Sequence, residues 1–194
     1  MCAYMDNKWR ILNVQYNNEA LALTTIWLFD DIGPETAQYV CYEILKSQEE
    51  DEICIFINSQ GGDLYSAIAI INTMRISTVP IRTIVCGTAF AMALHVAAAG
   101  TAGYRQCMKN SSYMYNEVQL SFGESSTHYS MSGYLEQFKK VVDMEKEMLI
   151  DVTNFTSEII DQYIMTGHEI FFTAQEALKY GIVDEVIDYA NISK

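Results

Sequence analysis

The hydrophobic positions of the first hundred residues follow two alternating spacings, and each spacing predicts one kind of element. Continuous runs of β-branched and aromatic residues predict buried strands, while apolar residues three and four positions apart predict helices. Strands and helices alternate in this order: 24–29, 35–46, 52–58, 64–74, 79–86 and 90–99. This alternation is typical of a layered α/β domain.

The second half of the chain has a less regular pattern and predicts one long helix. Thr173 is followed three residues later by Glu176, a capping-box pattern that begins a helix ending at Gly181. The other elements expected here are a strand at 113–115, a polar connection at 121–132, a partly exposed helix at 133–153 and a last strand at 182–187. We expect one domain over residues 1–194.

Charge and cysteine content narrow the class of protein. The formal net charge of -13 disfavours binding to nucleic acid, and no Lys/Arg-rich cluster offsets it. The five cysteines are widely spaced, which favours buried thiols in a reducing compartment over disulfides or metal ligands. The N-terminus lacks an apolar signal core, and the apolar stretch 89–99 is too short to cross a bilayer. We expect a cytoplasmic or organelle-interior protein with no membrane partner.

Two glycine turns follow predicted strands and offer candidate chemistry. Gly61 and Gly62 come directly after strand 52–58, and Gly87 follows strand 79–86 just before a helix rich in small residues. Backbone amides that converge from two such turns can stabilise an oxyanion, as acyl transfer requires. A Gly-Gly pair alone is also explained by a tight turn without any ligand.

Several segments together resemble the Clp protease proteolytic subunit family. Residues 57–62 read Ile-Asn-Ser-Gln-Gly-Gly, where the family has Asn-Ser-Pro-Gly-Gly, and residues 87–93 resemble its nucleophile segment Gly-Gln-Ala-Ala-Ser-Met-Gly. Residues 171–177 and 180–184 continue the similarity, which covers about 27–187. The resemblance implies the spiral α/β fold shared with the crotonases, with a protruding handle helix at about 119–153.

The resemblance also locates a catalytic triad, and the residues found there cannot perform its chemistry. The family's serine, histidine and aspartate fall on Ala91, Asn116 and Glu169, and its oxyanion-hole amides on Gly62 and Met92. Alanine has no nucleophile, and an asparagine amide does not titrate near neutral pH. The sequence therefore predicts a pseudo-protease. An engineered knockout would explain Ala91 but not Asn116 or Glu169.

A rewired hydrolase needs a different nucleophile or base. His95 lies four residues after Ala91 and could point into the same cleft, although a core histidine is the simpler interpretation. The remaining candidates are His128, His168, Ser59, Ser66 and Cys86, and none has a partner apparent from spacing.

Partners and cofactors follow from the resemblance alone. Family members form seven-membered rings stacked in pairs that enclose a chamber for peptides or unfolded proteins. The implied partners are further copies of this chain, an active Clp proteolytic subunit, and a Clp ATPase. The sequence contains no phosphate loop and no metal-ligand grouping, so neither a cofactor nor a metal is expected.

Two other hypotheses about function remain open besides a regulatory ring subunit. A crotonase-like acyl-CoA enzyme would use paired amides at a thioester with Glu169 as acid or base, but no basic cluster for the CoA phosphate is visible. The same residues are also compatible with a scaffold protein that binds peptides where the family has its catalytic cleft.

Overall fold

The computed structural model describes residues 15–16, 19–20, 23–116, 128–164 and 169–188. The first half contains β1 (Gln15–Tyr16), β2 (Glu19–Ala20), β3 (Leu23–Leu28), α1 (Pro34–Lys46), β4 (Glu52–Ser59), α2 (Leu64–Arg75), β5 (Ile81–Phe90) and α3 (Met92–Ala98). The second half contains β6 (Arg105–Met108), β7 (Ser112–Tyr115), α4 (His128–Ile150), α5 (Ser157–Ile164), β8 (Ile170–Thr173), α6 (Ala174–Lys179) and β9 (Glu185–Ile187). The predicted alternation of strands and helices is confirmed.

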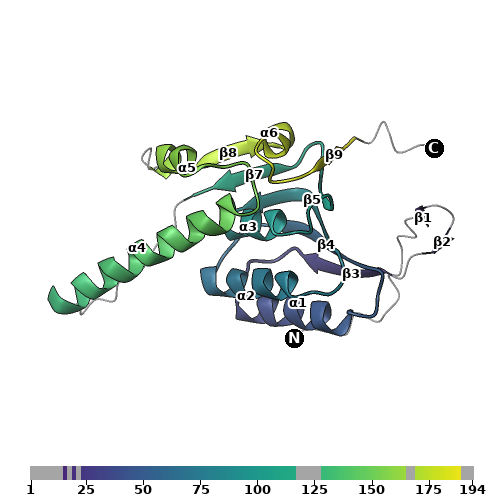
Figure 1. The fold of residues 1–194 in the computed structure, drawn as a ribbon, viewed down its shortest axis with the longest axis horizontal. Helices are drawn as coiled ribbons and strands as arrows, with labels where there is room; N and C mark the ends of the chain where they lie inside the picture. Colours follow the sequence, from purple (N-terminus) through teal and green to yellow (C-terminus); the bar gives the residue numbers. More distant parts are fainter. Residues whose placement is uncertain (1–14, 17–18, 21–22, 117–127, 165–168, 189–194) are drawn as a thin grey trace.

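A mostly parallel sheet organises the described residues. Its strands run in the order β3-β4-β5-β6-β9, and β5 is long enough to pair twice, with β6 through its first half and with β7 through its second. β7 also pairs antiparallel with β8. Helices α1, α2 and α3 lie on one side of β3, β4 and β5, while α4 extends away from the body (Figure 1). This arrangement agrees with the layered α/β fold that the sequence predicts.

Successive side chains along β3 and β4 point to opposite faces of the sheet. Ile26, Ile53 and Ile55 are fully buried against the helices. On the opposite face Phe56 joins a smaller apolar cluster, and the ring of Trp27 stacks on it with centroids 4.8 Å apart. Both faces of β4 are therefore covered, which explains its continuous apolar sequence.

Some boundaries differ from the sequence predictions. The long helix begins at residue 128, inside the segment expected to be a polar connection. The capping box at Thr173 is confirmed, since its Oγ1 accepts the Glu176 amide and Glu176 Oε2 accepts the Thr173 amide. β6, α5 and β8 had no predicted counterpart.

An ion pair joins the last strands to the rest of the sheet. The Arg105 guanidinium donates to both carboxylate oxygens of Asp184, over 3.0 and 2.5 Å, and also to the Val152 carbonyl. Burial would raise the pKa of the Asp184 carboxyl, but hydrogen bonds from Arg105 and the Gly103 amide outweigh it and lower that pKa. The pair connects β6, the turn after α4 and the segment before β9.

We expect Asp184→Ala to destabilise the fold by about 3 kcal/mol, because it leaves a largely buried guanidinium without its carboxylate. Thermal unfolding should show a Tm lower by about 6–12 °C. The lowered pKa means that the carboxylate stabilises the fold above the ordinary value of about 3.9, and that this contribution is lost as the pH falls through the folded value.

The matched control is Lys109→Ala. This change removes the ion pair between Lys109 and Asp188, in which the lysine side chain is 56% exposed. Its effect on Tm should be small. Equal losses in the two variants would contradict the structural role given to Asp184.

Candidate active-site cleft

A single residue, Ala91, joins β5 to α3 in a strained backbone conformation. Its φ of 47° and ψ of -123° make it the one non-glycine residue with positive φ among those the structure describes. Its amide donates to the Met114 carbonyl of β7 over 2.9 Å, and its own carbonyl accepts the Leu94 amide. Such strain persists only where the surroundings hold the backbone in place.

The loop after β4 approaches this turn more closely than any side chain would permit. A Cβ added to Gly61, whose φ is +94°, would lie 2.6 Å from the Phe90 carbonyl and 3.1 Å from the Met92 amide nitrogen. At Gly62, with φ +144°, it would lie 2.3 Å from the Ile32 carbonyl. Glycine is required at both positions. The turn predicted at Gly87 is wrong, because Gly87 lies inside β5, and the turn that the Gly61 loop approaches is the one at Ala91.

Backbone pairing with Ile32 fixes the direction of the loop. The Ile32 amide donates to the Gly61 carbonyl, and the Asp63 amide donates to the Ile32 carbonyl, each over 2.7 Å. Among the described residues, the amides of Gly62 and Met92 donate to no protein acceptor. Met92 opens α3, where amides of the first turn have no partner within the helix.

The side chains of Ser59 and Asn58 make hydrogen bonds that hold the loop around Gly61 in place. Ser59 Oγ donates to the Asp30 carbonyl over 2.8 Å and accepts the Gly61 amide over 3.1 Å. Asn58 Oδ1 accepts the Thr88 amide over 3.0 Å, beside the register shift between β4 and β5. The hydroxyl of Ser59 is thus engaged in both directions, which is a structural role and not that of a nucleophile.

Strand register brings the other two predicted positions to the same place. β5 pairs with β7 through Phe90 and Met114, and the last β7–β8 pair is Tyr115 with Ile170. Asn116 directly follows β7 and Glu169 directly precedes β8, next to this last pair, and the first is half-buried and the second exposed. The ends of β5, β7 and β8 therefore gather residues 91, 116 and 169.

His95 lies beneath the turn and not in the cleft. The residue is 3% exposed, with Nδ1 3.3 Å from the Ala91 carbonyl oxygen and Nε2 3.3 Å from Glu145 Oε1 on α4. Burial lowers the pKa of His95 to about 4. The expectation that His95 could point into the cleft is corrected, because four residues along a helix place its ring nitrogen under the carbonyl of residue 91.

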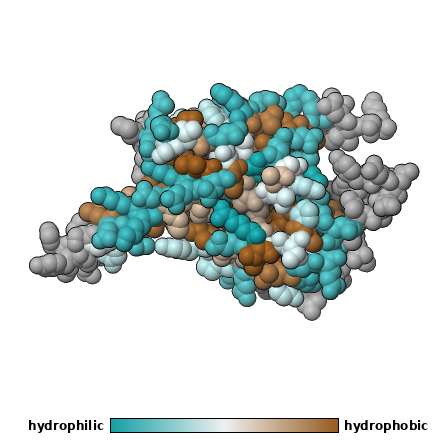
Figure 2. Space-filling model, viewed as in Figure 1, coloured by the Kyte–Doolittle hydropathy of each residue, from teal (hydrophilic) through white to brown (hydrophobic). Residues whose placement is uncertain are grey.

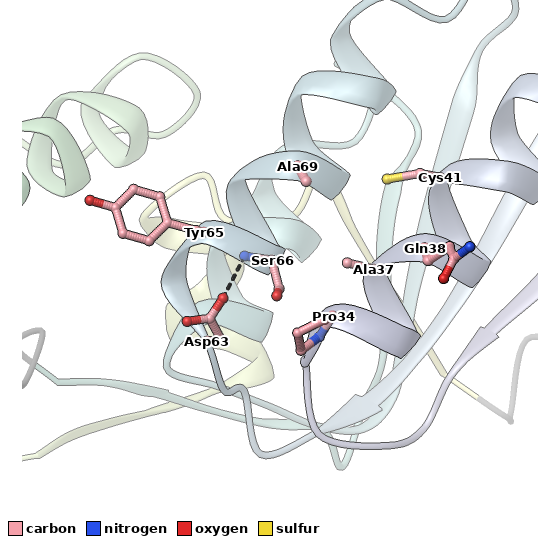
Figure 3. A pocket seen from close by; sticks show the side chains of 8 residues that line it. All are labelled: Pro34, Ala37, Gln38, Cys41, Asp63, Tyr65, Ser66 and Ala69. Atoms are coloured by element: carbon pink, nitrogen blue, oxygen red, sulfur yellow. Dashed lines mark hydrogen bonds between the residues drawn. The ribbon is translucent and has the colours of Figure 1, made fainter.

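The remaining candidates do not form a substitute site. Ser66 lines a shallow groove between α1 and α2, where the Asp63 carboxylate accepts the Ser66 amide over 2.8 Å and so caps α2 (Figure 3). Burial raises the pKa of the Cys86 thiol, which makes it a poorer nucleophile. His128 is the first residue of α4, and His168 lies outside the described residues.

Neither a metal nor a membrane segment is indicated where the structure can be described. Over those ranges no three metal-ligating side chains cluster. None of the helices there is both long and apolar enough to cross a bilayer.

Comparison with known proteins assigns this chain to one class, the proteins of the Clp protease type. A family profile described as Clp protease matches residues 12–190. The ATP-dependent Clp protease proteolytic subunit 2 of Nocardia farcinica is 31% identical, over 86% of this chain and 81% of that protein. Proteolytic subunit 1 of Corynebacterium jeikeium is 32% identical, over 87% of this chain and 89% of its own. The chain belongs to the Clp protease family.

Sequence reasoning missed one buried acid, Glu145, which contacts His95. A signal was present, because Glu145 lies midway between Val141 and Leu149 at helical spacing, on the apolar stripe of α4. All three side chains are buried. A glutamate on such a stripe indicates a partner in the core.

We expect Ala91→Gly to stabilise the fold by about 1 kcal/mol. Glycine relieves the positive-φ strain, and this gain exceeds the loss caused by the greater conformational entropy of glycine in the unfolded chain. Thermal unfolding should show a Tm higher by about 2–4 °C.

Ala93→Gly on the same helix is the control, since its backbone is helical and glycine should lower the Tm there. Equal destabilisation by both glycines would contradict the strain assigned to residue 91.

Proposed function

We propose that this chain is a catalytically inactive ring subunit that assembles into, or regulates, an ATP-dependent Clp protease complex. The observation that carries the proposal is an alanine in the strained turn between β5 and α3, at the position that matches the family's nucleophile. Asn116 and Glu169 support it, because only one of the three positions has a group that titrates.

Loss of the nucleophile and the base leaves little catalysis. In serine proteases, removing members of the triad costs about 10^4 to 10^6 in kcat, and the oxyanion hole alone gives the small remainder. The Gly62 and Met92 amides would supply that hole here. The expected peptidase rate is close to that of a serine protease whose nucleophilic serine has been replaced by alanine, whatever the substrate.

The shape of the chain supports assembly. α4 extends from the body as a handle would, and hydrophilic residues cover most of its visible surface (Figure 2). Two exposed apolar side chains, Tyr134 and Leu135, interrupt that surface near the start of the helix. Apolar residues on an otherwise polar protruding helix favour contact with another subunit.

The opposite sheet face offers a second contact surface. Trp27 and Phe29 are about half exposed, at 48% and 46%, and their rings meet edge to face with centroids 5.3 Å apart. Such a surface is suited to an apolar loop of a partner such as the ATPase. ATP hydrolysis would belong to that partner.

The assembly test is native mass spectrometry of the purified chain, alone and mixed with an active Clp proteolytic subunit from the same source, followed by a fluorogenic peptide assay. Mixed rings with an altered peptidase rate, and no turnover by this chain alone, are expected. Leu135→Glu is the control that should weaken assembly without touching the cleft. Turnover by the pure chain, or failure to enter rings of either kind, would contradict the proposal.

We further expect that Ala91→Ser alone stays inactive, whereas the triple variant Ala91→Ser/Asn116→His/Glu169→Asp gains peptidase activity by about 10^3-fold or more. Serine without a base is a poor nucleophile, and the triple variant restores nucleophile, base and orienting carboxylate at the positions that match the family triad. A peptidase assay with an active-site serine probe measures both variants. Full activity of the single variant would instead mean that the rest of the site is competent.

A further inference from the structure

Three apolar side chains form a row across β5, β7 and β8. Phe90 pairs with Met114 in the parallel register of β5 and β7, and Met114 pairs with Phe171 in the antiparallel register of β7 and β8. The outer strands are two spacings apart, about 9–10 Å. The rings of Phe90 and Phe171 nevertheless meet edge to face with centroids 5.7 Å apart, so they lean toward each other across Met114. We call these three side chains the apolar row.

The apolar row points away from the core. Successive residues of a strand point to opposite faces, and the next pair in the β7–β8 register, Tyr113 and Phe172, is buried in the main core. The three residues of the row belong to neither apolar cluster of the described chain. Phe171 is 56% exposed. The row is therefore not part of the packing that holds the fold together.

The row adjoins the candidate cleft. Phe90 immediately precedes the strained residue Ala91, and Phe171 lies two residues after Glu169. In the resemblance set out above, the position of Phe90 matches an alanine of the family's nucleophile segment, so the row depends on a ring that this chain adds. A peptide that passes the Ala91 turn would meet the row.

The polar side chains next to the row are already paired. One register step away on the same face, Thr88 and Thr173 flank Ser112. Thr88 Oγ1 accepts the side-chain amide of Gln60 over 3.2 Å, and Thr173 Oγ1 accepts the backbone amide of Glu176 over 3.3 Å. These threonine hydroxyls stabilise the chain itself, so the surface that the row offers to a ligand is apolar.

The size of the row fits one side chain and not a second protein. Burial of an aromatic side chain removes about 150–250 Å² from water, so the exposed part of Phe171 is on the order of 100 Å². A stable interface between two proteins buries about 800 Å² on each of them. The row is far too small for such an interface, whereas one large side chain of an extended peptide would cover it.

The charge of the chain favours some of these peptides over others. The formal net charge is -13, and the exposed Glu169 lies beside the row in the sequence. A basic residue next to the apolar one would be attracted to this surface, and an acidic residue would be repelled.

We propose that the apolar row binds a large apolar side chain of a peptide, with a basic residue next to it, beside the Ala91 turn. The proposal deepens the proposed function and rests on it in one respect, since a chain without a nucleophile holds such a peptide without cleaving it. The ligand is thus an unfolded segment or peptide chosen by one apolar side chain and its charged neighbour.

The experiment is fluorescence anisotropy with the full chain and a short labelled peptide of Gly and Ser that carries one Phe next to one Lys. Binding should saturate, and replacing the Phe of the peptide by Ala should weaken it by about tenfold or more, because the apolar contact is lost. Replacing the Lys by Glu should also weaken binding, and added salt should reduce that difference. A peptide with photoreactive benzoylphenylalanine in place of Phe should crosslink to β5, β7 or β8.

Variants of the chain form the second arm. Phe171→Ala, at a largely exposed position, should fold and bind the Phe peptide about tenfold more weakly, whereas Phe171→Leu stays apolar and should remain within about threefold of the wild type. The matched control is Tyr65→Ala, which removes an aromatic side chain on α2 that is 60% exposed and should leave binding unchanged.

Three results would overturn the proposal. The first is equal affinity for the Phe and Ala peptides, and the second is an equal loss of binding in Phe171→Ala and Tyr65→Ala. The third is a wild-type chain that binds no peptide while Phe171→Ala changes its oligomeric state in native mass spectrometry, which would assign the row to a contact between copies. Ring entry and peptidase turnover are measured apart from peptide affinity, so failure of the proposed function is distinguishable from failure of this one.

Discussion

The conformation of residue 91 depends on backbone contacts from three directions, and the cleft depends on that conformation. β7 holds its amide through the Met114 carbonyl, the Gly61 loop presses on the adjoining backbone, and the first turn of α3 binds its carbonyl. None of these contacts uses the side chain of residue 91. The shape of this turn is therefore a property of the sheet and of the Gly61 loop, and it does not depend on which side chain stands at residue 91.

The elements that the sequence predicted correctly are those whose environment repeats along the chain. β4 is covered on both faces, so its apolar run signals a strand without further information. β6 and β8 are four residues long, and their pairing partners β5, β7 and β9 are distant in the sequence. Their stability comes from non-local ladders, which a short window of sequence does not contain.

The residues of the candidate site also differ in whether local sequence is enough to predict them. The resemblance predicts the positions of Ala91, Asn116 and Glu169 from local motifs, and the pairings of β5 with β7 and of β7 with β8 bring the strands next to these motifs together. His95 was identified by its spacing from Ala91, but spacing does not tell whether a side chain lies under the turn or beside it. Glu145 reaches it through the packing of α4, which depends on tertiary structure.

A buried acid–base pair is a poor choice where stability alone matters, because apolar residues of similar size often serve as well or better. Its advantage lies in register. Val141 and Leu149 repeat every turn or two of α4, so an apolar seat with only these residues would tolerate a slip of the handle by one turn. Glu145 reaches His95 in one position of α4 only, and a helix slipped by one turn would lose that contact. The pair thus fixes where the handle rests, and through the Nδ1 contact it fixes that position relative to Ala91.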